Sequence, residues 1–158
     1  MWYGPADTLA AHLINAHDVV SIDRDKIVKF LWTPPIEDSS RVRYRVLNMM
    51  LNLSTPAKFV LEHTYNTESR FITFLVRTLN RDFKVRYKIS LVNRADTSNY
   101  LSFEGQTSYF DDFGHILESS EADQRKCFRI PLSVLKDFVF YNEEDDDSYF
   151  ALNVEFKI

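Results

Sequence analysis

The sequence of 158 residues contains little cysteine and little glycine. Its single cysteine, Cys127, excludes an internal disulfide and any metal centre built from several cysteines, and is typical of the reducing cytosol or nucleus. The three glycines, Gly4, Gly105 and Gly114, are too scattered for a Walker loop or a G-x-G-x-x-G motif. Nucleotide-binding enzymes of those two types are therefore excluded.

Long apolar runs and an excess of basic residues are also absent. No segment approaches the roughly 20 apolar residues that span a bilayer, and the N-terminus lacks the basic and apolar regions of a signal peptide. The formal net charge is −4, whereas nucleic-acid binding usually needs a basic surface. We therefore expect neither a membrane nor a nucleic acid as partner, and a cytoplasmic or nuclear location.

Apolar residues are abundant, at 45% of the chain, and aromatic residues reach 15%. A domain near 150 residues buries roughly 70% of its unfolded surface, so one domain with a core is expected. A short N-terminal helix is predicted from Pro5 to His17, and the apolar period then becomes mostly two. About eight short strands joined by turns predict a mainly β fold, an antiparallel sandwich.

Three segments carry the most informative patterns. Residues 71–77 are apolar on both faces, which predicts a central strand. In residues 85–91, apolar residues alternate with Arg86, Lys88 and Ser90, which predicts one buried and one solvent face. The acidic run 143–147 lacks the glycine and the ligand spacing of a calcium loop, so it predicts a solvated hairpin tip.

His12 and His17 form the most specific local motif, because their spacing fits the histidine half of a Cys2His2 zinc site. The alternative is a surface helix that carries two histidines. Catalytic groups are harder to place. Cys127 with His115 and Asp137 could form a nucleophilic site, but a cysteine at a strand start is more often packed in the core. No catalytic residue is assigned.

An alternating segment suggests a binding surface. Val42, Tyr44 and Val46 lie on one face of a predicted strand and three arginines on the other. The apolar row is either core or the wall of a peptide groove, because an edge strand offers unpaired N–H and C=O groups to an extended ligand. The arginine row is either a solvent face or a site for an acidic ligand.

Several stretches resemble one protein family over nearly the whole chain. Trp2-x-Gly4 followed by His12-Leu13 and His17 is similar to the last part of the second zinc finger of the Seven-in-absentia (SIAH) family, C-x-W-x-G…H-L-x-x-x-H. Further matches of order and pattern follow at 25–31, 59–62, 130–135 and 153–156. The resemblance implies that residues 1–18 are a zinc-finger remnant and residues 19–158 a TRAF-like substrate-binding domain.

Members of this family are RING-type E3 ubiquitin ligases, whose TRAF-like eight-stranded sandwich binds substrates and adaptors and forms a homodimer. The resemblance therefore implies binding of extended peptides with a Val-x-Pro core, leading to ubiquitination and proteasomal degradation of the target. An E2 enzyme would be recruited only through a RING, which this sequence lacks. The alternative is a RING-less adaptor or dominant partner that dimerises with an active ligase. A third possibility is an enzyme using Cys127 and His115.

The resemblance also assigns residues. His12 and His17 match the two histidine zinc ligands, whereas the two cysteine ligands have no counterpart. Zinc is thus expected only if those cysteines lie upstream. Six residues match the two stretches of the family's peptide groove: Val20, Ile22, Val42, Arg43, Tyr44 and Val46. The tryptophan of the family is replaced by tyrosine and its aspartate by arginine, which favours a more acidic ligand.

Overall fold

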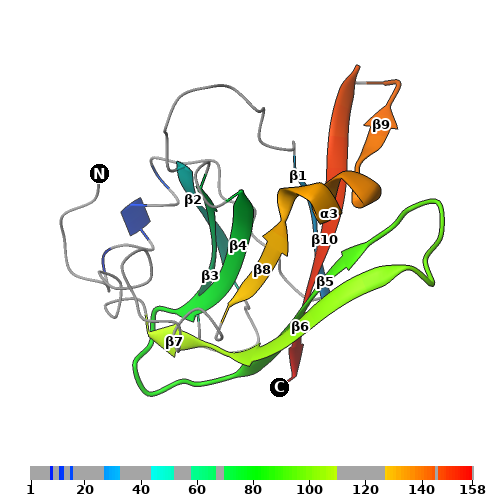
Figure 1. The fold of residues 1–158 in the computed structure, drawn as a ribbon. Helices are drawn as coiled ribbons and strands as arrows, with labels where there is room; N and C mark the ends of the chain where they lie inside the picture. Colours follow the sequence, from blue (N-terminus) through cyan, green and yellow to red (C-terminus); the bar gives the residue numbers. More distant parts are fainter. Residues whose placement is uncertain are drawn as a thin grey trace.

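The computed structural model describes residues 27–32, 44–51, 58–66, 70–109, 127–144 and 146–157, with Thr8, Ala11, His12 and Asn15 of an N-terminal helical segment. Within these residues the chain forms ten strands, with one short α-helix near the C-terminal end (Figure 1). All pairings are antiparallel except that of the two-residue strand β7 with β4. The prediction of a mainly β, antiparallel fold is confirmed.

The first sheet combines strands from both ends of the described chain. The C-terminal strand β10 lies between β1 and β5, and β6 forms the far end of the sheet. The short strand β9 pairs with the beginning of β10 as a hairpin. The strands are β1 (Ile27–Trp32), β5 (Arg86–Val92), β6 (Tyr100–Gln106), β9 (Phe140–Asn142) and β10 (Asp147–Lys157).

The second sheet is built around β4. Strand β3 pairs with one side of β4, and β8 and β7 share the other side; β2 pairs with β3 and ends the sheet. After β8 the chain turns into the helix α3 and a 3-10 turn, η2. The elements are β2 (Tyr44–Leu51), β3 (Lys58–Asn66), β4 (Phe71–Thr78), β7 (Ser108–Tyr109), β8 (Phe128–Pro131), α3 (Leu132–Leu135) and η2 (Lys136–Phe138).

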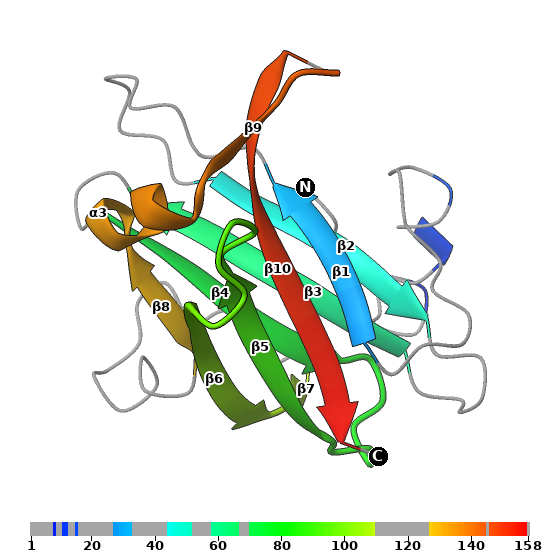
Figure 2. The same ribbon diagram turned by 90° about the vertical axis from the view of Figure 1, so that its right-hand side faces the viewer.

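The hydrophobic core lies between these two sheets. Figure 2 looks onto the sheet of β1, β10, β5 and β6, with β2, β3 and β4 behind it. The ring of Phe59 stacks on that of Phe156 at 4.5 Å, and Phe74 meets Phe150 edge-on at 6.2 Å. Each pair joins one sheet to the other, so burial of these rings holds the two layers together.

A further aromatic contact shows which edges of the two sheets lie on the same side of the sandwich. Phe103 of β6 stacks on Phe128 of β8, with 6.2 Å between the ring centroids. Since β6 and β8 meet at one side, β1 and β2 end their sheets at the opposite side. The edge strands β2 and β6 therefore lie on opposite sides of the described structure (Figure 2).

The predicted strands largely agree with the observed ones. Residues 71–77 form the centre of their sheet, with both faces mostly buried. The described residues of the acidic run are exposed: Glu143, Glu144 and Asp146 lie between β9 and β10, and Asp147 begins β10, as expected of a hairpin tip. The described part of strand β2 runs from Tyr44 to Leu51, beyond the alternation predicted at 42–46, and Val42 lies outside the described residues. The short strands β7 and β9 were not predicted, because two or three residues carry no readable period.

Candidate peptide-binding edge and polar sites

The predicted groove falls on the edge strand β2. Tyr44 and Val46 are its first and third residues, so they share one face of the strand. They lie opposite Tyr65 and His63 of β3. The other four predicted groove residues, Val20, Ile22, Val42 and Arg43, lie outside the described residues.

The position of β2 gives it a chemical property that a central strand lacks. Within the part of the chain that the structure describes, β2 pairs with β3 and with no other strand. Along the free side of such a strand, every second residue directs its N–H and C=O away from the sheet. An extended peptide can bind there by adding a strand.

His63 lies directly behind this edge. It is 9% exposed and opposite Val46 on β2 and Phe74 on β4, and its ring lies 6.0 Å from that of Phe74. Desolvation lowers the pKa of His63 to about 4. The imidazole is therefore neutral at physiological pH, and it provides no charge with which the edge could attract an acidic ligand.

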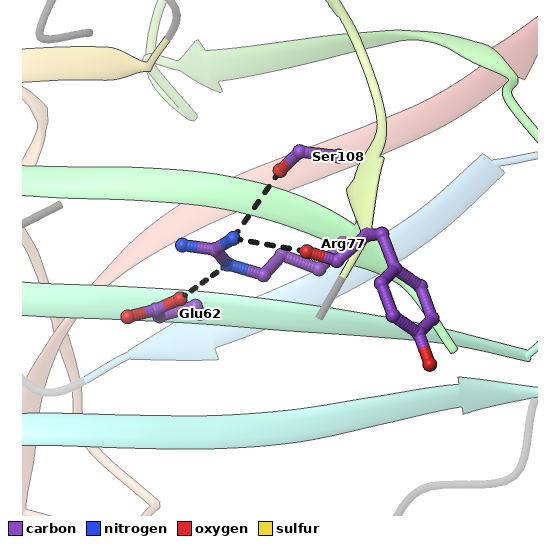
Figure 3. A network of polar contacts seen from close by, with 4 residues as sticks. Glu62, Arg77 and Ser108 are labelled. Atoms are coloured by element: carbon purple, nitrogen blue, oxygen red, sulfur yellow. Dashed lines mark hydrogen bonds and ion pairs between the residues drawn. The ribbon is translucent and has the colours of Figure 1, made fainter. Parts of the chain in front are cut away.

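A buried ion pair occupies the other face of the same sheet. Arg77 Nε donates to Glu62 Oε2 at 2.9 Å, and both side chains are almost fully buried (Figure 3). The Nη1 atom of Arg77 also donates to Ser108 Oγ at 3.4 Å and to the Tyr109 carbonyl at 3.3 Å. Arg77 thereby links β3, β4 and β7, which is a structural function rather than a ligand site.

This ion pair was not predicted from the sequence. Glu62 and His63 are neighbours on β3, so their side chains face opposite ways. One feature of the sequence could have indicated the ion pair. Arg77 ends a predicted strand that is apolar on both faces, and a charge buried there requires a counter-charge. Which carboxylate supplies it depends on strand register.

The zinc ligands expected from the resemblance are only partly described. His12 is half-buried in the helical segment, and His17 lies outside the described residues. In the described ranges, no three His, Cys, Asp or Glu side chains gather as a metal site would require. A structural zinc site needs four ligands, and the two histidines supply half of them. The described residues therefore do not assemble such a site around His12.

The described residues give no support to the third possibility, an enzyme using Cys127. Cys127 is 6% exposed and comes directly before β8, as expected of a packed cysteine. Asp137 lies in η2, and His115 lies outside the described residues. A buried thiol is a poor nucleophile, since apolar surroundings disfavour the thiolate.

The comparisons with known proteins add no identification: no family description matches the chain, and no curated protein matches it. In the described part of the chain, no helix has the length and apolar character needed to cross a membrane.

Proposed function

We propose that the chain is the substrate-binding part of a Seven-in-absentia-type ubiquitin ligase, with residues 19–158 as a TRAF-like sandwich. It binds an extended segment of a substrate or adaptor protein and pairs with a second copy. In a full-length ligase, binding here would position the target for ubiquitin transfer and proteasomal degradation. The chain itself contributes no catalytic residue to this function.

The strand arrangement supports the fold part of the proposal. Among the described residues, eight strands have four or more residues, and they divide equally between the two sheets. The resemblance implies the same number of strands in a two-layered sandwich. The remaining two, β7 and β9, have only two and three residues.

The edge position of β2 is the observation that carries the functional part. Tyr44 and Val46, which the resemblance assigns to the peptide groove, are on a strand that pairs on one side within the described residues. Main-chain hydrogen bonds to β2 would supply affinity, and alternate side chains would supply selectivity. Zinc belongs to this proposal only with two cysteine ligands that the sequence does not contain.

Peptide titration tests the groove assignment. The probe is a fluorescein-labelled peptide with a Val-x-Pro core, measured by fluorescence anisotropy. If Tyr44 is an anchor, Tyr44→Ala weakens binding by roughly 1–3 kcal/mol, or about 5–150-fold, whereas Tyr44→Phe retains the aromatic wall. Tyr141→Ala, at an exposed tyrosine on β9, is the matched control. If Tyr44→Ala binds the peptide with unchanged affinity, the assignment of the peptide groove to β2 is wrong.

The charge of Arg43 offers a second test of the same groove. Peptides with the same core and either acidic or basic flanks should differ, with the acidic version binding more tightly. Arg43→Asp, which restores the aspartate of the family, should reverse the order. Equal binding of both versions to the unmodified protein would contradict the acidic preference.

A RING-less adaptor is a second candidate function for this chain. With a single cysteine, the chain lacks the zinc ligands of a RING. A RING-less chain that pairs with an active ligase would act as an adaptor or a dominant partner. Co-purification of the tagged chain with a RING-bearing relative from the same cells tests this, and purification as a pure self-assembly would contradict it.

A further inference from the structure

Strand β6 is a second edge, at the side of the sandwich opposite β2 (Figure 2). Within the described residues it pairs with β5 alone. Apolar residues of this strand are unusually accessible, because Tyr100 is 52% and Leu101 36% exposed. Leu101 lies opposite the fully buried Leu91, so it belongs to the core face and is exposed because the sheet ends there. The edge therefore presents accessible apolar surface on both of its faces.

The hydrogen-bond pattern shows which backbone groups this edge presents. At the two ends of the β5–β6 ladder, Thr107 N–H donates to the Val85 carbonyl and Asn93 N–H to the Asn99 carbonyl. Because bonded and non-bonded pairs alternate in an antiparallel ladder, the odd-numbered residues of β6 bond to β5. The even-numbered residues direct N–H and C=O outward, and all four have exposed side chains: Tyr100, Ser102, Glu104 and Gln106.

This edge lacks two common features that prevent strand pairing. It is seven residues long, and it contains no proline and no lysine. Within the described residues, no strand pairs with its outward row of N–H and C=O groups. The row is therefore accessible to an extended chain.

The outer face beside this edge carries more positive than negative charge. Glu104, the one charge of β6, is matched by two cations: Lys157 Nζ lies 2.7 Å and Arg86 Nη2 3.8 Å from its carboxylate oxygens. Lys88 of β5 is a third cation, and its Nζ lies 5.6 Å from the centre of the Tyr100 ring, so it is directed toward the edge. All three cations lower the pKa of Glu104, first through the hydrogen bond from Lys157.

An added antiparallel strand would contact two different surfaces. Its residues opposite Leu101 and Phe103 would lie on the core face, in non-hydrogen-bonded pairs that bring side chains close together, so apolar residues fit there. Its residue opposite Ser102 would lie on the outer face, where the small serine leaves it within reach of Lys88. An acidic residue fits that position, because Glu155, opposite Lys88, lies on β10 and one strand farther from the edge.

We propose that β6 binds an extended segment of a partner protein as an added antiparallel strand, in which acidic residues alternate with apolar ones. Main-chain hydrogen bonds to the even-numbered residues of β6 supply affinity. The acidic side chains match the cations of the outer face, and the apolar ones cover Leu101 and Phe103. This inference goes beyond the proposed function and does not depend on it. Since β2 and β6 lie on opposite sides, one chain can hold a segment at each edge.

Peptide titration by fluorescence anisotropy tests the chemistry of the ligand. The probes are three fluorescein-labelled peptides of about seven residues, the length of one strand, in which valine alternates with glutamate, serine or lysine. The glutamate peptide should bind most tightly and the lysine peptide least tightly. Added salt should weaken binding of the glutamate peptide, because the charges involved are exposed. Equal binding of the three peptides, or the reverse order, would overturn the proposal.

Two substitutions test the location of the site. Ser102→Pro removes one outward N–H and places a ring in the path of an added strand, whereas the bonds of the odd-numbered residues to β5 remain. It should abolish binding of the glutamate peptide. Lys88→Met retains the aliphatic stem and should weaken the glutamate peptide by about 2–5-fold, with the serine peptide unchanged. Binding of the glutamate peptide that neither substitution weakens would remove the site from β6.

Arg129→Met is the matched control for Lys88→Met. It also removes a cation that lies over an aromatic ring, but from β8 on the second sheet. This variant should bind the glutamate peptide like the wild type. An equal loss of affinity in Arg129→Met and Lys88→Met would show that net charge, rather than the edge at β6, determines binding.

Two further measurements separate this site from the other candidates. Ser102→Pro should keep its circular dichroism spectrum and its affinity for the Val-x-Pro peptide, whereas Tyr44→Ala should still bind the glutamate peptide. The two edges therefore succeed or fail independently. Sedimentation velocity tests whether a second copy occupies β6. Ser102→Pro should leave the association state of the chain unchanged, and a wild-type dimer that this substitution dissociates would overturn the proposal.

Discussion

The outer faces of the two sheets differ in the solvent exposure of their charged side chains. On the first sheet, the residues of β5 that face away from the core are Arg86, Lys88 and Ser90, all exposed or half-buried. Their neighbour Glu104 is exposed and pairs with Lys157 in water. On the second sheet, the corresponding face of β3 and β4 buries the charges of Glu62 and Arg77, whereas Arg129 of β8 is exposed.

The difference shows what determines the contribution of an ion pair to folding. Both pairs have short contacts, 2.7 Å for Lys157–Glu104 and 2.9 Å for Arg77–Glu62. In water the charges are screened and the long side chains lose entropy, so such pairs add little stability. In a buried site each charge depends on the other, because neither can be solvated after its partner is removed. Burial, not distance, therefore separates the two pairs.

The largest expected effect comes from breaking the buried pair. Arg77→Met leaves the Glu62 carboxylate buried without its counter-charge and should lower the free energy of unfolding by about 3–5 kcal/mol. Lys157→Met, which removes the same kind of partner from an exposed carboxylate, should cause little or no change. Urea unfolding followed by circular dichroism measures both.

A double variant sharpens this result. Glu62→Gln in the Arg77→Met background removes the isolated charge and should recover part of the lost stability, since a buried neutral group is less costly than a buried charge. If Arg77→Met and Lys157→Met were equally destabilising, burial would not be the deciding factor.

The second expected effect concerns the inner face of the same strand. His63 is buried, and desolvation lowers its pKa to about 4. The unfolded chain, with a histidine pKa near 6.5, binds this proton more readily. Stability is therefore complete above about pH 6.5 and decreases as the pH falls toward 4, by about 3 kcal/mol in all.

Urea unfolding at several pH values measures this dependence. His63→Gln removes the titrating group and should flatten the stability profile between pH 6.5 and 4, whatever its effect at neutral pH. A slope that persists in His63→Gln would assign the effect to other groups.

The sequence predicted alternation well and long-range pairing poorly. Two patterns were predicted correctly: β5 has one apolar face and β4 has two. Each pattern is a local property of its strand. The partner of Arg77 is 15 residues away on another strand, and its identity depends on the register between β3 and β4. A pattern within one segment carries no information about that register.

The candidate site shows the same limit. The alternation at residues 42–46 predicted a strand and allowed either a core or a groove, and only the order of the sheets places β2 at an edge. The exposure of Leu101 was likewise invisible in the sequence. An apolar residue at a core-facing position is expected to be buried. The exposure of Leu101 follows from the position of β6, which is the last strand of its sheet among the described residues.

The smallest expected effect compares the two faces of β6. A methyl group added at Gly105 would lie 2.7 Å from Phe103 Cε1 and 3.1 Å from the Tyr87 ring. Gly105→Ala should therefore destabilise the fold by about 1–3 kcal/mol through overpacking, reduced by the roughly 0.4–1 kcal/mol that replacing glycine gains from the unfolded chain. Ser102→Ala, on the exposed face of the same strand, should be nearly neutral.

Both variants are compared by urea unfolding at one protein concentration, so that any self-association contributes equally. The two neighbouring rings differ in their freedom to move: Tyr87 is fully buried between the sheets, whereas Phe103 is only partly buried beside the edge. If Gly105→Ala unfolds like the wild type, Phe103 has rotated toward solvent and the edge is softer than the core behind it. A clear loss would show that the tight packing of the inner face extends to the last strand of the sheet.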